Sequence, residues 1–251
     1  MQIKKILVSQ PKPADDKSPY LDLSARFEIE VVFRPFIKVE GIPAKEFRTQ
    51  KVNISEFTAV IFTSKAAADN FFRLAEETRF HIPDTFKYFC TTESIANYLQ
   101  KYIVYRKRKI FFGLTGRLDD PQLKSSFQRH NKEKFLFPIS DVHNAATKQL
   151  DDCKLKYTKA VMYRTVSNDF TPDEPFDYDM LVFFTPAGIN SLKKNFTDFD
   201  QTKRPVAIAC LGPATVKAAE EAGLTVDIAA PTPATPSMPA AIAAYLRERE
   251  E

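Results

Sequence analysis

Short apolar runs that lead into helix-capping residues recur along the chain, and this alternation constrains the fold more than any other feature. The runs lie at residues 5–8, 58–62, 87–90, 134–137, 180–184 and 206–211. Ser64, Ser140 and Thr185 follow three of them, and each suits the N-cap position just before a helix, because its side-chain oxygen can accept from an unpaired N–H of the first turn. Strands that alternate with helices in this way indicate an α/β protein with parallel sheets.

Helical patterns follow most of these runs. They occupy residues 65–77, 93–101, a stretch after Ser140-Asp141 to about 151, 186–195, and a stretch after Gly212-Pro213 that Gly223 closes. Pro186 and Pro213 suit the first helical position, where a missing N–H is tolerated.

A weak internal repeat divides the chain into two similar parts. A shift of 122 residues places the end of the run at 58–62 on the end of the run at 180–184, and 88–91 on 210–213. One offset that matches two consecutive units predicts two similar lobes. We expect flavodoxin-like lobes at 1–35 with 167–251 and at 38–160, joined by linkers at 32–37 and 161–166, so that one lobe is discontinuous.

Ligands of open α/β sheets bind at the carboxyl ends of the strands. Helices that begin there offer free N–H groups and the positive end of the helix dipole. We therefore expect a cleft between the lobes that receives an anion with several negative groups.

Composition narrows the class of protein. The chain has 251 residues, a net charge of +4 and three cysteines without a C-x-x-C pair, which disfavours a disulfide framework and indicates a reducing compartment. Residues 1–9 resemble a first strand rather than a secretory signal, and no apolar run is long enough to cross a bilayer. We expect a soluble, cytoplasmic protein that does not bind a membrane.

Several common catalytic motifs are missing from the sequence. The six glycines form neither a dinucleotide fingerprint nor a phosphate loop, and no G-x-S-x-G motif is present. The three histidines, His81, His130 and His143, have no metal-ligand spacing. We therefore expect no metal and no cofactor, and an enzyme that acts by binding and orienting a reactive substrate.

The motifs resemble those of the uroporphyrinogen-III synthase family along nearly the whole chain. Residues 60–64 (VIFTS) and 181–188 (LVFFTPAG) resemble the two copies of its strand-to-helix turn. Residues 211–215 (LGPAT) and 222–224 (AGL) resemble the start and end of a later helix of the family. Residues 230–232 and the final helical stretch at 238–249 resemble the C-terminal end of the family's chain. Residues 161–165 (VMYRT) resemble the crossing segment that carries the family's tyrosine.

This resemblance implies a cyclising hydro-lyase of tetrapyrrole and heme biosynthesis. Its substrate would be hydroxymethylbilane, which the enzyme closes to uroporphyrinogen III with loss of water and inversion of ring D through a spiro intermediate. Without the enzyme the bilane closes to the uninverted isomer, so the main task of the protein is to select one geometry. We expect a monomer with a small-molecule substrate and no nucleic-acid partner.

The resemblance also implies the site residues. Tyr163 is the catalytic candidate, because a phenol can donate a hydrogen bond to the departing hydroxyl without carrying charge. The substrate-binding candidates are Ser64, Lys65, Ala66, Ser140, Asp141, Thr185, Ala187, Gly188, Ala214 and Thr215. Asp141 would repel carboxylates, so helix capping is its alternative role.

Some residues depart from the family pattern. Gln10 stands where many members have arginine, Cys90 begins a turn that usually contains glycine, and Ala214 replaces a common threonine. Residues 101–117 hold six Lys or Arg and no acid, a basic stretch that the resemblance does not explain.

Other functions stay open at this point. The chain could be a two-lobed protein that binds an anionic tetrapyrrole or another polyanion without turnover. A glycosyltransferase-like enzyme would need a diphosphate-sugar site, which the few glycines disfavour. The basic stretch at 101–117 could also contact nucleic acid, although a solvated face is the simpler interpretation.

Overall fold

The computed structural model describes residues 2–13, 18–141, 147–153, 155–171 and 175–249. It divides into two compact units, residues 1–38 with 166–251, and residues 39–165. Each unit contains one sheet flanked by helices, and most of the neighbouring strands pair in parallel. The strand Ile37–Gly41 lies antiparallel to Tyr157–Ser167, since the N–H of Ile42 donates to Met162 O and the N–H of Asn168 donates to Phe36 O. The predicted α/β class with parallel sheets is confirmed.

The first unit has a five-stranded sheet in the order β11-β10-β9-β1-β2. Its elements are β1 (Lys5–Val8), α1 (Pro19–Phe27), β2 (Glu30–Phe33), β9 (Met180–Phe183), α7 (Pro186–Asn195), β10 (Ala207–Leu211), α8 (Pro213–Glu221), β11 (Ile228–Ala230) and α9 (Met238–Arg247). From β2, this order is 2-1-3-4-5, the flavodoxin-like order.

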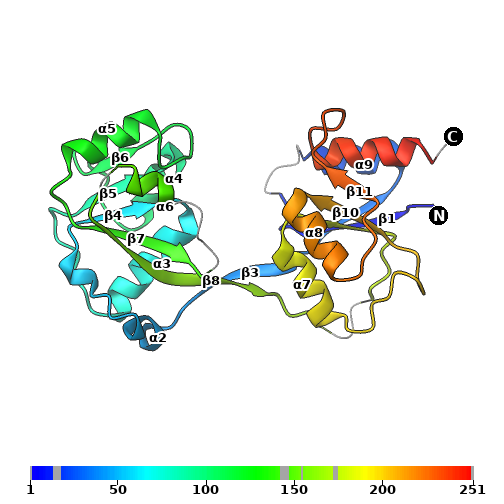
Figure 1. Ribbon diagram of the computed structural model, residues 1–251, viewed down its shortest axis with the longest axis horizontal. Helices are drawn as coiled ribbons and strands as arrows, with labels where there is room; N and C mark the ends of the chain where they lie inside the picture. The colour runs from blue at the N-terminus through cyan, green and yellow to red at the C-terminus, as the bar shows by residue number, and fades with distance from the viewer. Residues whose placement is uncertain (1, 14–17, 142–146, 154, 172–174, 250–251) are drawn as a thin grey trace. The chain divides into compact units, whose positions relative to one another are not determined.

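The second unit has a six-stranded sheet in the order β3-β8-β7-β4-β5-β6 (Figure 1). Its elements are β3 (Ile37–Gly41), α2 (Ala44–Thr49), η1 (Ile54–Glu56), β4 (Ala59–Phe62), α3 (Lys65–Glu77), β5 (Lys87–Cys90), α4 (Glu93–Tyr98), η2 (Leu99–Lys101), β6 (Ile110–Phe112), α5 (Pro121–Arg129), β7 (Phe135–Ser140), α6 (Thr147–Asp151) and β8 (Tyr157–Ser167). Without β3, the order β8-β7-β4-β5-β6 has the same 2-1-3-4-5 pattern. Here β7 and β8 take positions 1 and 2 of the pattern, although they follow β4, β5 and β6 in the chain.

Both passages of the chain between the units run through β3 and β8, which are neighbours in the second sheet. The first passage lies after 38, slightly later than the predicted linker at 32–37, because Val32 and Phe33 belong to β2 and Phe36 is fully buried in the first unit. The second lies at 165–166, within the long strand β8.

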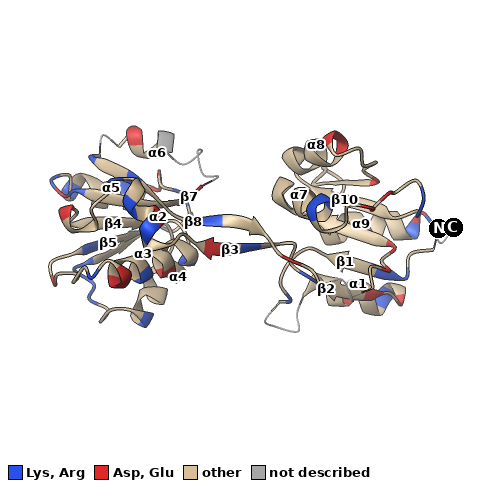
Figure 2. Ribbon diagram, turned by 90° about the horizontal axis from the view of Figure 1, so that it is seen from below, with Lys and Arg blue, Asp and Glu red and all other residues tan. Residues whose placement is uncertain are grey.

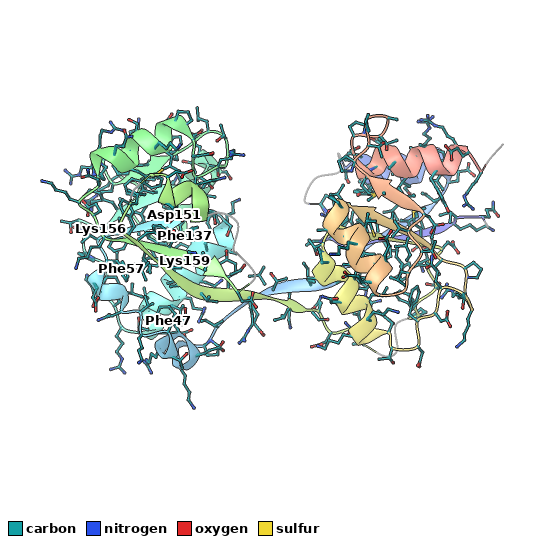
Figure 3. The ribbon with its side chains drawn as sticks, in the orientation of Figure 1. Phe47, Phe57, Phe137, Asp151, Lys156 and Lys159 are labelled. Atoms are coloured by element: carbon teal, nitrogen blue, oxygen red, sulfur yellow. The ribbon has the colours of Figure 1, made fainter. Side chains whose placement is uncertain are left out.

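Both faces of each sheet are covered, as parallel sheets require. In β4 the side chains alternate: Val60 and Phe62 pack with α3 and α4, whereas Ile61 packs with α5 and α6. Phe137, on β7, lies inside the unit on the second of these faces (Figure 3). In the first unit α1 and α9 cover one face, and α7 and α8 cover the other. Among the described residues, no helix combines the length and apolarity needed to cross a membrane.

A buried carboxylate fixes the loop between β6 and α5. Asp120 is 3% exposed and accepts hydrogen bonds from the backbone N–H groups of Leu114, Thr115, Gln122 and Leu123 and from the Thr115 hydroxyl. Burial alone would raise the pKa of Asp120, but the N–H groups of Leu114 and Leu123 and the donors of Thr115 outweigh it and lower the pKa to about 2.

We expect Asp120→Ala to lower the free energy of unfolding by about 1–3 kcal/mol, because several donors lose their acceptor. Since folding lowers this pKa, its stabilisation is present above about pH 4 and is lost as the pH falls toward 2. Urea titrations followed by circular dichroism at pH 7 and pH 3 measure both effects. Asp119→Ala is the control, because the ion pair that Asp119 makes with Arg117 lies at the surface. Equal losses in the two variants would contradict this role of Asp120.

Candidate functional site

The strand order places one candidate site in each unit. In 2-1-3-4-5 sheets the ligand binds at the carboxyl ends of the two strands where the order reverses. In the second unit these strands are β7 and β4, which are paired, and the residues at their ends are Ser140 and Ser64. In the first unit they are β1 and β9, followed by Ser9 and Thr185. Sequence analysis and topology therefore select the same edge of each sheet.

Ser64 is the N-cap residue of α3, as predicted. Its backbone is extended, at φ −155° and ψ 161°, and its Oγ accepts from the N–H of Ala67 at 3.0 Å. Within the described part of the chain, no acceptor takes the N–H of Lys65 or Ala66. These two groups and the dipole of a 13-residue helix can receive an anion.

Tyr163 lies beside this helix start. Its hydroxyl is 3.4 Å from Ser64 Oγ, and its side chain is partly buried. The register of β7 and β8 shifts here, since Ile139 pairs with Val161 whereas Ser140 pairs with Tyr163. Such irregularities often direct a side chain at an active site. The structure therefore brings two sequence-predicted residues, 99 positions apart, within reach of one ligand group.

Lys65 is exposed and held over an aromatic ring. Its Nζ lies 5.3 Å from the centre of the Tyr98 ring, and Lys101 Nζ lies 5.4 Å from the same ring. Cation–π attraction orients an ammonium group without neutralising it.

Asp69 organises this group of side chains. Its Oδ1 accepts from the Tyr98 hydroxyl at 2.8 Å, from Lys101 Nζ at 3.1 Å and from the Tyr102 hydroxyl. Partial burial raises the pKa of Asp69, but these three donors outweigh it and hold the pKa below its ordinary value. Sequence analysis did not select Asp69 or Tyr98, because only the fold brings α3 and α4 together.

Ser140 and Asp141 are described, but residues 142–146, where the predicted helix would begin, lie outside the described residues. Ser140 is the last residue of β7, and the described helix α6 begins at Thr147. Asp141 lies in a turn, where its N–H donates to Tyr163 O at 3.2 Å and its carboxylate accepts from the Thr165 N–H at 3.4 Å. The predicted first turn of the helix, including His143, lies outside the described residues.

In the first unit Thr185 caps α7, and its Oγ1 accepts from the N–H of Gly188 at 3.3 Å. Ala187 lies in the same turn and is half-buried. Gly188 is buried, and a side chain there would press against the Phe183 ring at 3.1 Å. A side chain at this position would therefore require the Phe183 ring to move by a few tenths of an ångström.

The start of α8 differs, because Gly212 has no side chain with which to cap it. Its φ of +81° favours glycine and lets the chain turn directly into Pro213. Ala214 is exposed and offers only backbone atoms. Thr215 is 2% exposed and its N–H donates to Gly212 O, so its side chain has little surface for a ligand.

Histidine, cysteine and carboxylate side chains give no metal centre in the part of the chain that the structure describes. His130 packs against the rings of Phe89 and Phe111, and burial lowers its pKa. Cys90 and Cys210 are buried, and burial raises the pKa of both thiols.

The fold and these helix starts define a class of α/β protein in which two units each present backbone N–H groups at the carboxyl edge of a parallel sheet. A family model described as "Uroporphyrinogen-III synthase HemD" matches residues 20–240. The chain belongs to this family, whose enzymes are lyases of porphyrin and heme biosynthesis.

A solved structure agrees with this assignment at the level of the fold. Uroporphyrinogen-III synthetase from Helicobacter pylori 26695 superposes with a TM-score of 0.56 at 15% identity, over 98% of this chain and all of that chain. A mutant uroporphyrinogen III synthase from the extremely thermophilic bacterium Thermus thermophilus gives 0.46 at 12% identity, over 99% of this chain and 100% of that chain. No sequence among curated proteins matches the chain.

We expect Ser64→Ala to lower the free energy of unfolding by about 1 kcal/mol, because the N–H of Ala67 loses its acceptor. Ser64→Thr, which keeps a capping oxygen, should retain most of the stability. Ser94→Ala, an exposed serine inside the first turn of α4, is the control for loss of a hydroxyl alone. A loss of stability as large in Ser94→Ala, measured by urea unfolding, would contradict the capping role.

Proposed function

We propose that the protein is a uroporphyrinogen-III synthase. It takes hydroxymethylbilane, a linear polycarboxylate, and closes it to uroporphyrinogen III with loss of water and inversion of ring D. The observation that carries the proposal is the 3.4 Å approach of the Tyr163 hydroxyl to Ser64 Oγ, at the start of α3 and at the reversal of the strand order. Membership of the family supports the same reaction.

The binding role falls mainly on backbone groups. The N–H groups of Lys65 and Ala66 and the ammonium of Lys65 take carboxylates in the second unit, and the hydroxyl of Ser140 adds a neutral donor. Other carboxylates are bound in the first unit, at the starts of two helices. These are α7, with Thr185, Ala187 and Gly188, and α8, with Ala214. Thr215 contributes by fixing the first turn of α8, and Asp141 by holding Tyr163 O.

The chemical role falls on Tyr163. Its hydroxyl donates a hydrogen bond to the oxygen that leaves the hydroxymethyl carbon, and water departs to give an azafulvene. The substituted carbon of the terminal pyrrole attacks that carbon and forms a spiro intermediate. The intermediate fragments and closes again with ring D inverted. The enzyme thus selects which carbon attacks by holding the chain in one geometry.

This proposal includes no cofactor, metal, nucleic acid or membrane partner, and it places a monomer in the cytoplasm. A coupled assay tests the reaction. Hydroxymethylbilane is generated in place, the protein is added, and the oxidised type I and type III products are separated by chromatography. We expect type III product in proportion to protein concentration. Type I alone, at the spontaneous rate, would overturn the proposal and favour a protein that binds an anionic tetrapyrrole without turnover.

We expect Tyr163→Phe to slow type III formation about 10- to 100-fold, the range in which a single acid or hydrogen-bond donor contributes. Tyr157→Phe is the matched control, because it removes a hydroxyl from the same strand, one that donates to Asp151 instead. The control should keep the wild-type rate. A Tyr163→Phe variant with the wild-type rate would remove Tyr163 from the mechanism and leave the function in place.

A further inference from the structure

The second unit has a cavity at the other end of α3, away from Ser64. It has a volume of about 530 Å³ and is formed by the C-terminal ends of α2 and α3 together with the segment around η1. The lining residues are Phe47, Arg48, Lys51, Val52, Asn53, Ile54, Ser55, Thr78, Arg79, Phe80 and His81. Since α3 is about 20 Å long, this cavity is distinct from the candidate substrate site.

The wall of this cavity is positively charged. Arg48, Lys51 and Arg79 line it, and no Asp or Glu does. Figure 2 shows the basic segments on α2. The carboxylates nearest in sequence to the two arginines are paired elsewhere: Glu46 with Arg164 at 3.0 Å, and Glu77 with Arg73 at 2.7 Å. The three cations therefore face one cavity and make no ion pair with any residue that the structure describes.

A second cavity, in the first unit, shows that this arrangement is not general. It has a volume of about 840 Å³ and is also lined by basic residues, among them Lys193, Lys203 and Arg249. Its lining includes three aspartates, Asp198, Asp200 and Asp227, so its charges balance. The cavity beside α2 lacks such compensation.

Two of the three cations, Lys51 and Arg79, lie at unfavourable backbone angles. Lys51 has a φ of 55° and Arg79 a φ of 57°, in the left-handed region, which disfavours residues with a side chain and where glycine is usual after a helix. The helix dipole favours a positive charge at each of these helix ends. It does not require that both charges and Arg48 line the same cavity.

Apolar side chains form part of the cavity lining. Phe47 is 1% exposed on α2 (Figure 3), Ile54 is buried, and Val52 and Phe80 pack against the same core. Asn53 and Ser55 add polar groups beside the cations. A lining that combines apolar side chains, neutral polar groups and three cations fits an anionic group on a partly apolar body, and the volume lies in the range of small-ligand sites.

We propose that this cavity binds a small organic anion, an aryl or acyl carboxylate or phosphate, with its charged group between Arg48, Lys51 and Arg79. The binding is independent of the proposed reaction, because none of these residues belongs to the candidate substrate site.

The probe is 8-anilinonaphthalene-1-sulfonate, an aromatic anion that fluoresces in apolar surroundings, titrated into the full chain. We expect saturable binding to one site, weakened about tenfold or more in the double variant Arg48→Gln, Arg79→Gln, because charge-assisted hydrogen bonds are lost. The double variant Lys107→Gln, Arg108→Gln removes the same charge from an exposed loop of the same unit and should bind as the wild type does. Arg48→Lys with Arg79→Lys should recover part of the affinity.

Competition then identifies the chemical group. Benzoate or phenyl phosphate should displace the probe, and neutral benzamide should not. No saturable binding, equal weakening in the Lys107 and Arg108 variant, or equal displacement by benzamide would each overturn the proposal. Type III product formation should be unchanged in the Arg48 and Arg79 variant. A wild-type protein without that activity would count against the proposed function and leave this test intact.

Discussion

The burial of both faces of each parallel sheet determines where this protein can bind a ligand. Parallel strands need crossover helices, and a helix that follows a strand must begin at the carboxyl edge of the sheet. The first N–H groups of each such helix have no acceptor inside the helix. Ser64 and Thr185 satisfy one N–H each and leave others for a ligand. A chain without a glycine-rich phosphate loop can thus still build an anion site.

Strand β8 carries three roles that the rest of the second unit depends on. It pairs with β7, it contains one of the two passages between the units, and it presents Tyr163 to Ser64. The register shift opposite Ser140 lets β8 both pair with β7 and present Tyr163 to Ser64. One extra residue in β8 changes which side chain faces the start of α3. In the first unit β2 completes the same pattern and ends after four residues, without a counterpart to Tyr163.

Local sequence signals were enough for β1, β4, β5, β7, β9 and β10 and for the capped starts of α3 and α7. They were too little for α1, α2 and α5 and for the contacts between elements. The spacing of apolar residues and Ser64 predicted the helix at 65–77 with its observed bounds. The apolar run predicted at 134–137 is shorter than the observed strand, which contains Pro138, a residue that cannot donate to a sheet. In the structure Pro138 lies beyond the residues that pair with β4, so β7 continues to Ser140. No local pattern marks the left-handed backbone of Lys51 and Arg79 or the meeting of Asp69 with Tyr98, because tertiary packing produces both.

The anion sites that we propose at the two ends of α3 attract negative charge by different means, and the difference follows from the helix dipole. At its start the dipole already favours an anion, so Lys65 needs only to be oriented. The Tyr98 ring does this without cancelling the charge, whereas a carboxylate partner at that distance would compete with the ligand. At its end the dipole opposes an anion, and a site there requires full positive charges that no carboxylate neutralises. Arg48, Lys51 and Arg79 meet that requirement, which is why their shared cavity indicates a second ligand rather than an extension of the first site.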